Sequence, residues 1–208
     1  ALAGILVLLL MKVQNKPIKP EKSAWSAILM ICAVQIVLQY VFYYLGVGNT
    51  SGVRGSVLSA TSTFFSVIIA HFVFVTDKLT LKKTIGCIIG FLGVIAVLSG
   101  SGFGYEKVKI TCEGFMLMSA VGQGIGAVVS RKVAKGKDAM LLTGWQLFIG
   151  GVFLSLVGLL GKGQINITPK GFILLLYLAI LSAVAFSLWT VMLKYQPVAK
   201  VTVYMFLV

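Results

Sequence analysis

The feature that most constrains this chain is a series of long segments without a single Asp, Glu, Lys or Arg. A helix needs about 20 apolar residues to cross the hydrocarbon core of a bilayer. The segments are continuously apolar rather than alternating, which predicts membrane-spanning helices and not the strands of a membrane barrel. The uncharged segments span residues 23–53, 55–76, 84–105, 114–130, 139–161 and 171–193.

The first segment is too long for one simple crossing, and residues 46–52 contain a turn signal rich in Gly, Asn, Thr and Ser. We therefore end one helix near residue 46 and begin the next near residue 50. This predicts six complete spans, with partial spans at 1–11 and 201–208. Because both ends fall within apolar runs, we expect the chain to be cut inside a helix at each end. The predicted fold class is an all-α integral membrane protein, a polytopic helix bundle.

The composition excludes an ordinary water-soluble domain. Hydrophobic residues make up 59% of the chain and charged residues only 11%, against roughly 45–50% and about 25% in soluble domains. The net charge of +13 could indicate nucleic-acid binding, but that function needs a basic face on a soluble fold. We expect the bilayer, and no nucleic acid, as a partner.

Positive charge is unevenly divided between alternate loops, which predicts the orientation of the spans. One side carries only Arg54, Lys107, Lys109, Lys162 and Lys170. By the positive-inside rule, the richer side faces the cytoplasm. The richer side carries Lys12, Lys16, Lys19, Lys22, Lys78, Lys82, Lys83, Arg131, Lys132, Lys135, Lys137, Lys194 and Lys200.

Residues capable of chemistry are scarce. The three cysteines have neither a disulfide pattern nor zinc spacing, so we expect no metal and no cofactor. All five carboxylates fall in loops or at helix ends, whereas proton-coupled carriers commonly place one at membrane depth. A single histidine without a nearby acidic cluster argues against a membrane-embedded enzyme, and no catalytic residue is assigned.

Several glutamines lie within the predicted spans. Gln35 and Gln39 are one helical turn apart and so should share a face, which Tyr43 extends. We interpret this stripe as the wall of a solute cavity, and treat Gln123 and Gln146 in the same way. The alternative is that these amides only tie helices together, for about 1 kcal/mol or less each.

Three further side chains have two interpretations each. His71 lies inside a span, where an ionisable residue is a functional candidate, although a neutral histidine bonded to a neighbouring helix is the alternative. Trp189 and Tyr40 could form aromatic cavity walls, or they could be interfacial anchors, an alternative that the nearby Lys194 favours for Trp189.

A weak internal repeat appears at an offset of 146 residues, which lays 40–62 on 186–208. Tyr40 then meets Phe186 and Arg54 meets Lys200. The predicted helix at 24–46 runs outward and its partner at 170–193 runs inward. Two copies of opposite orientation are typical of inverted-repeat transporters.

Two sets of motifs recur in order along the chain. The first is residues 44–60, 77–80 and 86–94, and the second is Gly114-Phe115, Ser130-Arg131-Lys132, Gln146 and residues 177–183. In their order and spacing these residues resemble the EamA domain of the drug/metabolite transporter superfamily. The resemblance implies ten helices in two inverted five-helix repeats. On that map the chain runs from the end of helix 2 into helix 9, with residues 1–104 in the first repeat and 105–208 in the second.

The resemblance also implies a function, with two departures. The family often has Glu where this chain has Asp77, a conservative change, and Pro where it has Thr63, so that we expect a helix kink to be absent there. The implied function is transport of a small metabolite or drug-like solute by alternating access. We expect the protein to be an exporter in the plasma membrane and to form a homodimer. The alternative is a membrane receptor or scaffold that binds a ligand without moving it.

Overall fold

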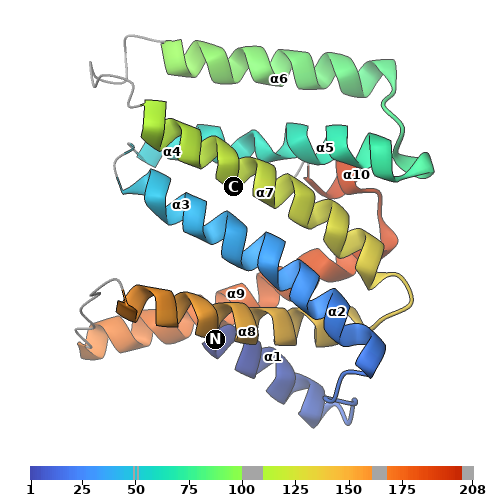
Figure 1. The fold of residues 1–208 in the computed structure, drawn as a ribbon, viewed down its shortest axis with the longest axis vertical. Coiled ribbons are helices and arrows are strands. Elements are labelled where there is room, and N and C mark those ends of the chain that lie inside the picture. The colour runs from blue at the N-terminus through green and yellow to red at the C-terminus, as the bar shows by residue number, and fades with distance from the viewer. Residues whose placement is uncertain (49, 51, 100–109, 161–167, 203–208) are drawn as a thin grey trace. The chain divides into compact units, whose positions relative to one another are not determined.

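The computed structural model describes residues 1–48, 50, 52–99, 110–160 and 168–202, and every regular element in these residues is a helix (Figure 1). The α-helices are α1 Leu2–Val13, α2 Lys22–Ile31, α3 Gln39–Val47, α4 Gly52–Ala60, α5 Ser62–Val73, α6 Leu81–Ser99, α7 Ile110–Ala134, α8 Ala139–Leu160, α9 Pro169–Tyr195 and α10 Val198–Thr202. A π-helical segment, η1 Cys32–Leu38, joins α2 to α3, and a 3₁₀ turn, η2 Val75–Asp77, follows α5.

Five of the predicted spans are long and apolar enough to cross a bilayer. They are Lys22–Val47, Arg54–Val73, Cys112–Ala134, Ala139–Leu160 and Pro169–Tyr195. The sixth predicted span, 84–105, forms most of α6, but its end lies outside the described residues, and the apolar part of the described helix is Lys83–Ala96. Of the partial spans, α1 is present, whereas 203–208 also lie outside the described residues.

Two spans depart from a regular α-helix. The first contains the π-helical turn η1, and the second is interrupted at Thr61, between α4 and α5. The expectation of an unkinked helix near Thr63 was therefore wrong. The amide of Thr61 donates to Leu58 O at 3.2 Å, a tightened turn, and its hydroxyl bonds the same carbonyl. A hydroxyl that competes for backbone carbonyls bends a helix without any proline.

The described chain forms two compact units. The first unit comprises Ala1–Val37 and Val129–Tyr195, and the second comprises Leu38–Val128 and Gln196–Val208. Each unit thus combines chain from both sides of the predicted repeat boundary at 104/105. A sequence repeat and a packing unit need not coincide, so these units do not test the repeat boundary at 104/105, which stays a prediction.

In the first unit, α1 lies beside α8 and α9 (Figure 1). A Cβ atom on Gly4 would lie 2.7 Å from Gly144 O, so only glycine permits this close approach of α1 to α8. The core between α2, α7 and α8 is entirely apolar. It consists of Ala24, Ala27, Ile28, Ile31, Ala134 and Leu142.

In the second unit, α3, α4, α5 and α7 pack closely, and α10 lies against α5. The Asp77 carboxylate accepts the Val198 amide at 2.9 Å, and the Thr63 hydroxyl donates to Thr202 O at 3.0 Å. Both positions that depart from the family pattern therefore contact α10. Asp77 receives one of the backbone N–H groups that the start of a helix leaves without an intrahelical partner.

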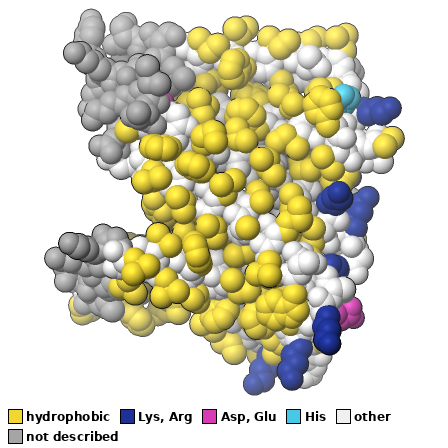
Figure 2. Space-filling model, viewed as in Figure 1, with side chains coloured by type: hydrophobic (Ala, Val, Ile, Leu, Met, Phe, Trp, Pro, Cys, Tyr) yellow, Lys and Arg dark blue, Asp and Glu magenta, His cyan; other side chains and the backbone are white. Residues whose placement is uncertain are grey.

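Apolar side chains also cover the outside of the helices, as the face in Figure 2 shows. Helix α9 is the extreme case, because only 11% of its apolar window is buried. Exposed apolar surface of this extent is unfavourable in water and expected in lipid. The chain is a multi-pass, all-α membrane protein, as the uncharged segments predict. The exposed apolar side chains of α9 include Phe172, Ile173, Leu174, Leu175, Tyr177 and Leu178.

Candidate functional site

The second unit contains a cavity of about 370 Å³. Four helices supply its wall, and each contributes small or polar side chains to it. The lining residues are Gln39, Tyr40 and Tyr43 on α3, Ser56, Ser59 and Ala60 on α4, Ser62 on α5, and Ser119, Ala120 and Gln123 on α7. A volume in this range is typical of small-molecule sites.

Three of the predicted site residues meet at this cavity: Gln39, Tyr43 and Gln123. Helical periodicity brings them there. Gln39 and Tyr43 are one turn apart on α3, and Ser119 and Gln123 are one turn apart on α7. The Ser119 hydroxyl donates to Gln39 O at 3.0 Å, which fixes α7 against the start of α3.

The cavity wall is rich in hydrogen-bonding groups that the protein does not use. Within the described structure, six lining side chains donate or accept no hydrogen bond. Each carries a hydroxyl or a carboxamide, so each is both a donor and an acceptor. These six are Gln39, Tyr40, Tyr43, Ser59, Ser62 and Gln123, called the free polar set below.

Packing between aromatic rings holds the tyrosines of α3. The ring centroid of Tyr44 lies 6.0 Å from that of Tyr40 and 5.8 Å from that of Tyr43, distances typical of favourable aromatic pairs. The two cavity tyrosines are thus positioned by a ring that is itself largely exposed. Tyr40 was weighed as an aromatic wall in the sequence, and the structure places it in the cavity lining.

Gln35 and Gln146 lie in the first unit and do not line this cavity. Gln35 belongs to the π-helical segment and is 4% exposed, and its carboxamide accepts the Ser130 hydroxyl at 2.6 Å. That contact ties η1 to α7. Gln146 on α8 is fully buried, yet neither atom of its carboxamide has a hydrogen-bond partner among the described residues.

His71 and Trp189 also lie away from the cavity lining. The His71 Nδ1 atom accepts the Leu79 amide at 3.0 Å, so the ring stabilises the turn that follows α5. Its ring also contacts Phe72 edge-on, with centroids 5.2 Å apart. Trp189 is half-buried on α9, in the first unit.

Four serines that line the cavity were not predicted from the sequence, where only larger polar residues were proposed as site residues. Ser56, Ser59 and Ser62 recur at every third position, and Ser119 precedes Gln123 by one turn. Such spacing places small hydroxyls on one helix face. The spacing was the available signal, although serines inside spans also serve as helix contacts.

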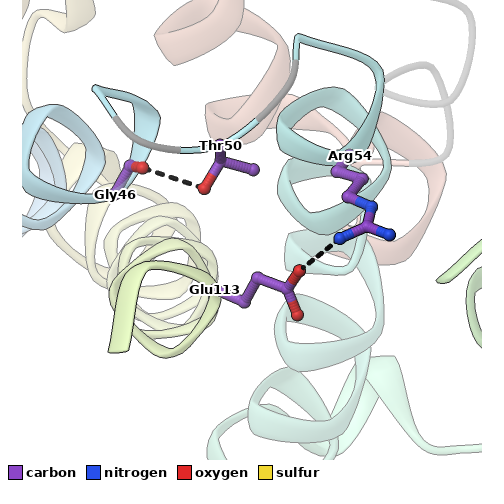
Figure 3. A network of polar contacts seen from close by, with 4 residues as sticks. All are labelled: Gly46, Thr50, Arg54 and Glu113. Atoms are coloured by element: carbon purple, nitrogen blue, oxygen red, sulfur yellow. Dashed lines mark hydrogen bonds and ion pairs between the residues drawn. The ribbon is translucent and has the colours of Figure 1, made fainter. Parts of the chain in front are cut away.

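An ion pair joins α4 to α7 in the same unit (Figure 3). Arg54 Nη1 lies 3.2 Å from Glu113 Oε1, and the two side chains are 10% and 14% exposed. Nearby, the Thr50 hydroxyl donates to Gly46 O at 2.9 Å, at the end of α3. Arg54, one of the few cations on the charge-poor side of the predicted topology, therefore already has an anionic partner.

The described residues contain no group of three or more His, Cys, Asp or Glu side chains that could hold a metal ion. The wall of the cavity is likewise made of neutral side chains. This arrangement can bind a solute through hydrogen bonds and aromatic contact. It provides no nucleophile activated by an adjacent base at the cavity.

Comparison with known proteins gives a consistent result. The model of the EamA-like transporter family matches residues 1–99 and 111–208. An uncharacterised transporter of Archaeoglobus fulgidus is 27% identical over 91% of this chain and 66% of its own length. A chloroplastic WAT1-related protein of Arabidopsis thaliana is 24% identical over 90% of this chain and 47% of its own length.

A third relative, the uncharacterised transporter YvbV of Bacillus subtilis, is 31% identical over 66% of this chain and 44% of its own length. The chain thus spans about half to two thirds of these relatives. No solved structure matches it significantly. The family match covers nearly all residues, so the chain belongs to the EamA-like transporter family.

Proposed function

We propose that the protein carries a small solute across a bilayer, and that the cavity of the second unit forms part of its solute site. One observation supports this proposal above the others. Six polar side chains that have no hydrogen-bond partner among the described residues surround a cavity within a bundle of apolar helices long enough to span a membrane. Polar groups in a membrane protein are normally bonded internally, because unsatisfied groups are costly in hydrocarbon. Groups left free around a cavity are available to a solute.

Transport would proceed by alternating access between two inverted repeats, 1–104 and 105–208. The offset of 146 residues and the opposite predicted orientation of the repeated helices support this mechanism. Family membership supports transport in general. Export is the proposed direction. His71, Gln35, Gln146 and Trp189 remain proposed solute contacts in other states of the carrier.

The proposed location is the plasma membrane, with a homodimer as the proposed assembly and no enzymatic activity. Because one relative is named as chloroplastic, location needs its own measurement. Fractionation of the native membranes, with antibody detection of the protein, would test it. Cross-linking in intact membranes would test the dimer.

The test of transport uses the full-length protein in two settings. Metabolites are quantified by mass spectrometry inside and outside expressing cells, and the solutes that shift are then assayed with purified protein in liposomes. Gln39→Leu and Gln123→Leu should reduce the flux, because each removes a free carboxamide from the cavity wall. Gln14→Leu is the matched control, since Gln14 is an exposed amide at the end of α1.

Two outcomes would contradict the proposal. If no solute shifts in cells or liposomes, transport itself is unsupported. If purified protein binds a solute but produces no flux in liposomes, the protein is a receptor with the same cavity. Loss of cavity variants from the membrane fraction would not count, so expression and folding are measured first.

A further inference from the structure

The chemistry of the cavity wall suggests which solutes it accepts, provided that the proposed transport function is correct. The ten lining side chains comprise hydroxyls, carboxamides and two alanines, with no Asp, Glu, Lys, Arg or His among them. Hydroxyls and carboxamides each donate and accept hydrogen bonds. A solute group that does the same can satisfy them in several orientations.

A charged group would find no counterion in this wall. Two of the four lining helices carry a charged pair, Arg54 of α4 and Glu113 of α7, but these two side chains already bind each other at 3.2 Å. Transferring an unpaired charge out of water is far more expensive than transferring a neutral polar group. The cost is greatest where the surroundings are hydrocarbon, as they are for these spans.

A purely apolar solute fits no better, because it would cover the free polar set without bonding to it. Buried donors and acceptors left without partners are penalised, whereas pairing them with a solute recovers the loss. The two tyrosine rings add flat, partly apolar surface beside the carboxamides. The wall therefore matches groups that combine several neutral donors and acceptors with some carbon surface.

We propose that this cavity binds the uncharged, hydrogen-bonding part of its solute, such as a polyol or a carboxamide. It discriminates against the same scaffold when that part carries a carboxylate or an ammonium group. The discrimination arises because Gln39, Gln123 and the surrounding hydroxyls can each switch between donor and acceptor roles, but none can neutralise a charge.

The test compares compounds that share a scaffold and differ in one terminal group, which is neutral, anionic or cationic. One set is D-sorbitol, D-gluconate and D-glucamine, and the other is nicotinamide, nicotinate and 3-picolylamine. Binding to the purified full-length protein is measured by calorimetry at neutral pH, in an assay separate from the liposome transport assay. In at least one set, the neutral member should bind at least about tenfold more tightly than both charged members.

A charged cavity variant supplies the second measurement. Gln123→Glu preserves the side-chain size and places a carboxylate in the wall, so the amine of the responsive set should gain about tenfold relative to the neutral member. Gln14→Glu adds the same charge at an exposed site outside the cavity and should leave the order unchanged. Gln123→Leu should weaken the neutral member without favouring the amine.

The proposal is overturned if neither neutral compound binds, or if a charged member binds the wild type as tightly as its neutral counterpart. Preference for the amine would instead indicate cation recognition by the tyrosine rings. An equal shift with Gln14→Glu would show that the effect is long-range electrostatics. Because binding is measured apart from flux, the expected order without liposome transport would contradict the proposed transport alone.

Discussion

The two compact units differ in how they use the polar side chains of their spans. In the first unit, Gln35 and the buried hydroxyls are bonded to one another or to the backbone, with Gln146 as the exception among the described residues. Gln35 accepts the Ser130 hydroxyl at 2.6 Å, and the Thr143 and Thr190 hydroxyls lie 2.8 Å apart. In the second unit, six hydroxyl and carboxamide side chains line a cavity and have no hydrogen-bond partner in the described part of the chain.

The difference shows that residue type alone does not assign a role within a membrane span. Gln35 and Gln39 are four residues apart in one span, yet the first ties helices together and the second faces a cavity. Interhelical hydrogen bonds contribute modestly in membranes, about 0.6 kcal/mol on average. The free polar set makes no such bond among the described residues, so its hydrogen-bonding groups remain available for binding.

The largest expected effect concerns the bonded amide. Gln35→Leu should lower the free energy of unfolding by about 2 kcal/mol, because it removes one hydrogen bond and leaves the buried Ser130 hydroxyl unpaired. Gln39→Leu should lower it by less than about 0.5 kcal/mol, since no bond is lost. Denaturant unfolding of the purified variants would measure both.

The double variant Gln35→Leu/Ser130→Ala serves as the control for this prediction. It removes both partners, and so should recover about 1 kcal/mol of the loss. Equal destabilisation by Gln35→Leu and Gln39→Leu would break the comparison between the two units. It would mean that Gln39 has a bonding role in the folded protein.

The next effect is on transport, and here the unbonded Gln39, rather than a bonded side chain, is expected to matter. Gln39→Leu should reduce flux in liposomes about tenfold, equivalent to about 1.4 kcal/mol, because a solute loses a hydrogen-bonding contact in the cavity. The bonded pair offers the matched test: Thr143→Val on α8 should leave flux within about twofold. A larger flux defect for Thr143→Val than for Gln39→Leu would reverse the assignment of the two regions.

A smaller effect is expected from the threonine pair itself. Thr143 and Thr190 also bond backbone carbonyls of their own helices, so their mutual bond between α8 and α9 is only one of several. A double-mutant cycle with Thr143→Val and Thr190→Val should give a coupling energy of about 0.6 kcal/mol. A coupling near zero would show that the intrahelical bonds suffice.

The sequence predicts most of this fold because charge marks where a span cannot continue. The uncharged segments locate the helices to within a few residues, and the glycine-rich turn after residue 46 separates the first two spans. The π-helical turn at Cys32–Leu38 and the break at Thr61 were not predicted. Both features depend on which backbone carbonyl each amide bonds, and the hydropathy of the side chains carries no information about that.

The candidate site was predictable only in part, for a related reason. Tyr43 follows Gln39 by one regular turn, and both line the cavity. Extending the same interval back to Gln35 assumes regular α-helix, but Gln35 lies in the π-helical segment, where hydrogen bonds span five residues. Whether a glutamine finds a partner, as Gln35 finds Ser130, depends on a helix 95 residues away along the chain.

The smallest change is expected at Gln146. This residue belongs to the first unit, but within the described chain its carboxamide lacks the hydrogen bonds that the other buried polar side chains of that unit make. It is fully buried on α8, and neither carboxamide atom has a partner in the described part of the chain. Gln146→Leu loses no hydrogen bond and removes a buried carboxamide that has no partner among the described residues, so its unfolding free energy should not fall below that of wild type. If the amide contacts the solute in another state, the flux through the Gln146→Leu variant should fall about threefold.

Two outcomes would change this view of Gln146. Destabilisation comparable to that of Gln35→Leu would mean that Gln146, like Gln35, forms a hydrogen bond between helices. Unchanged stability with unchanged flux would exclude it from the solute path, and confine that path's free amides to the second unit.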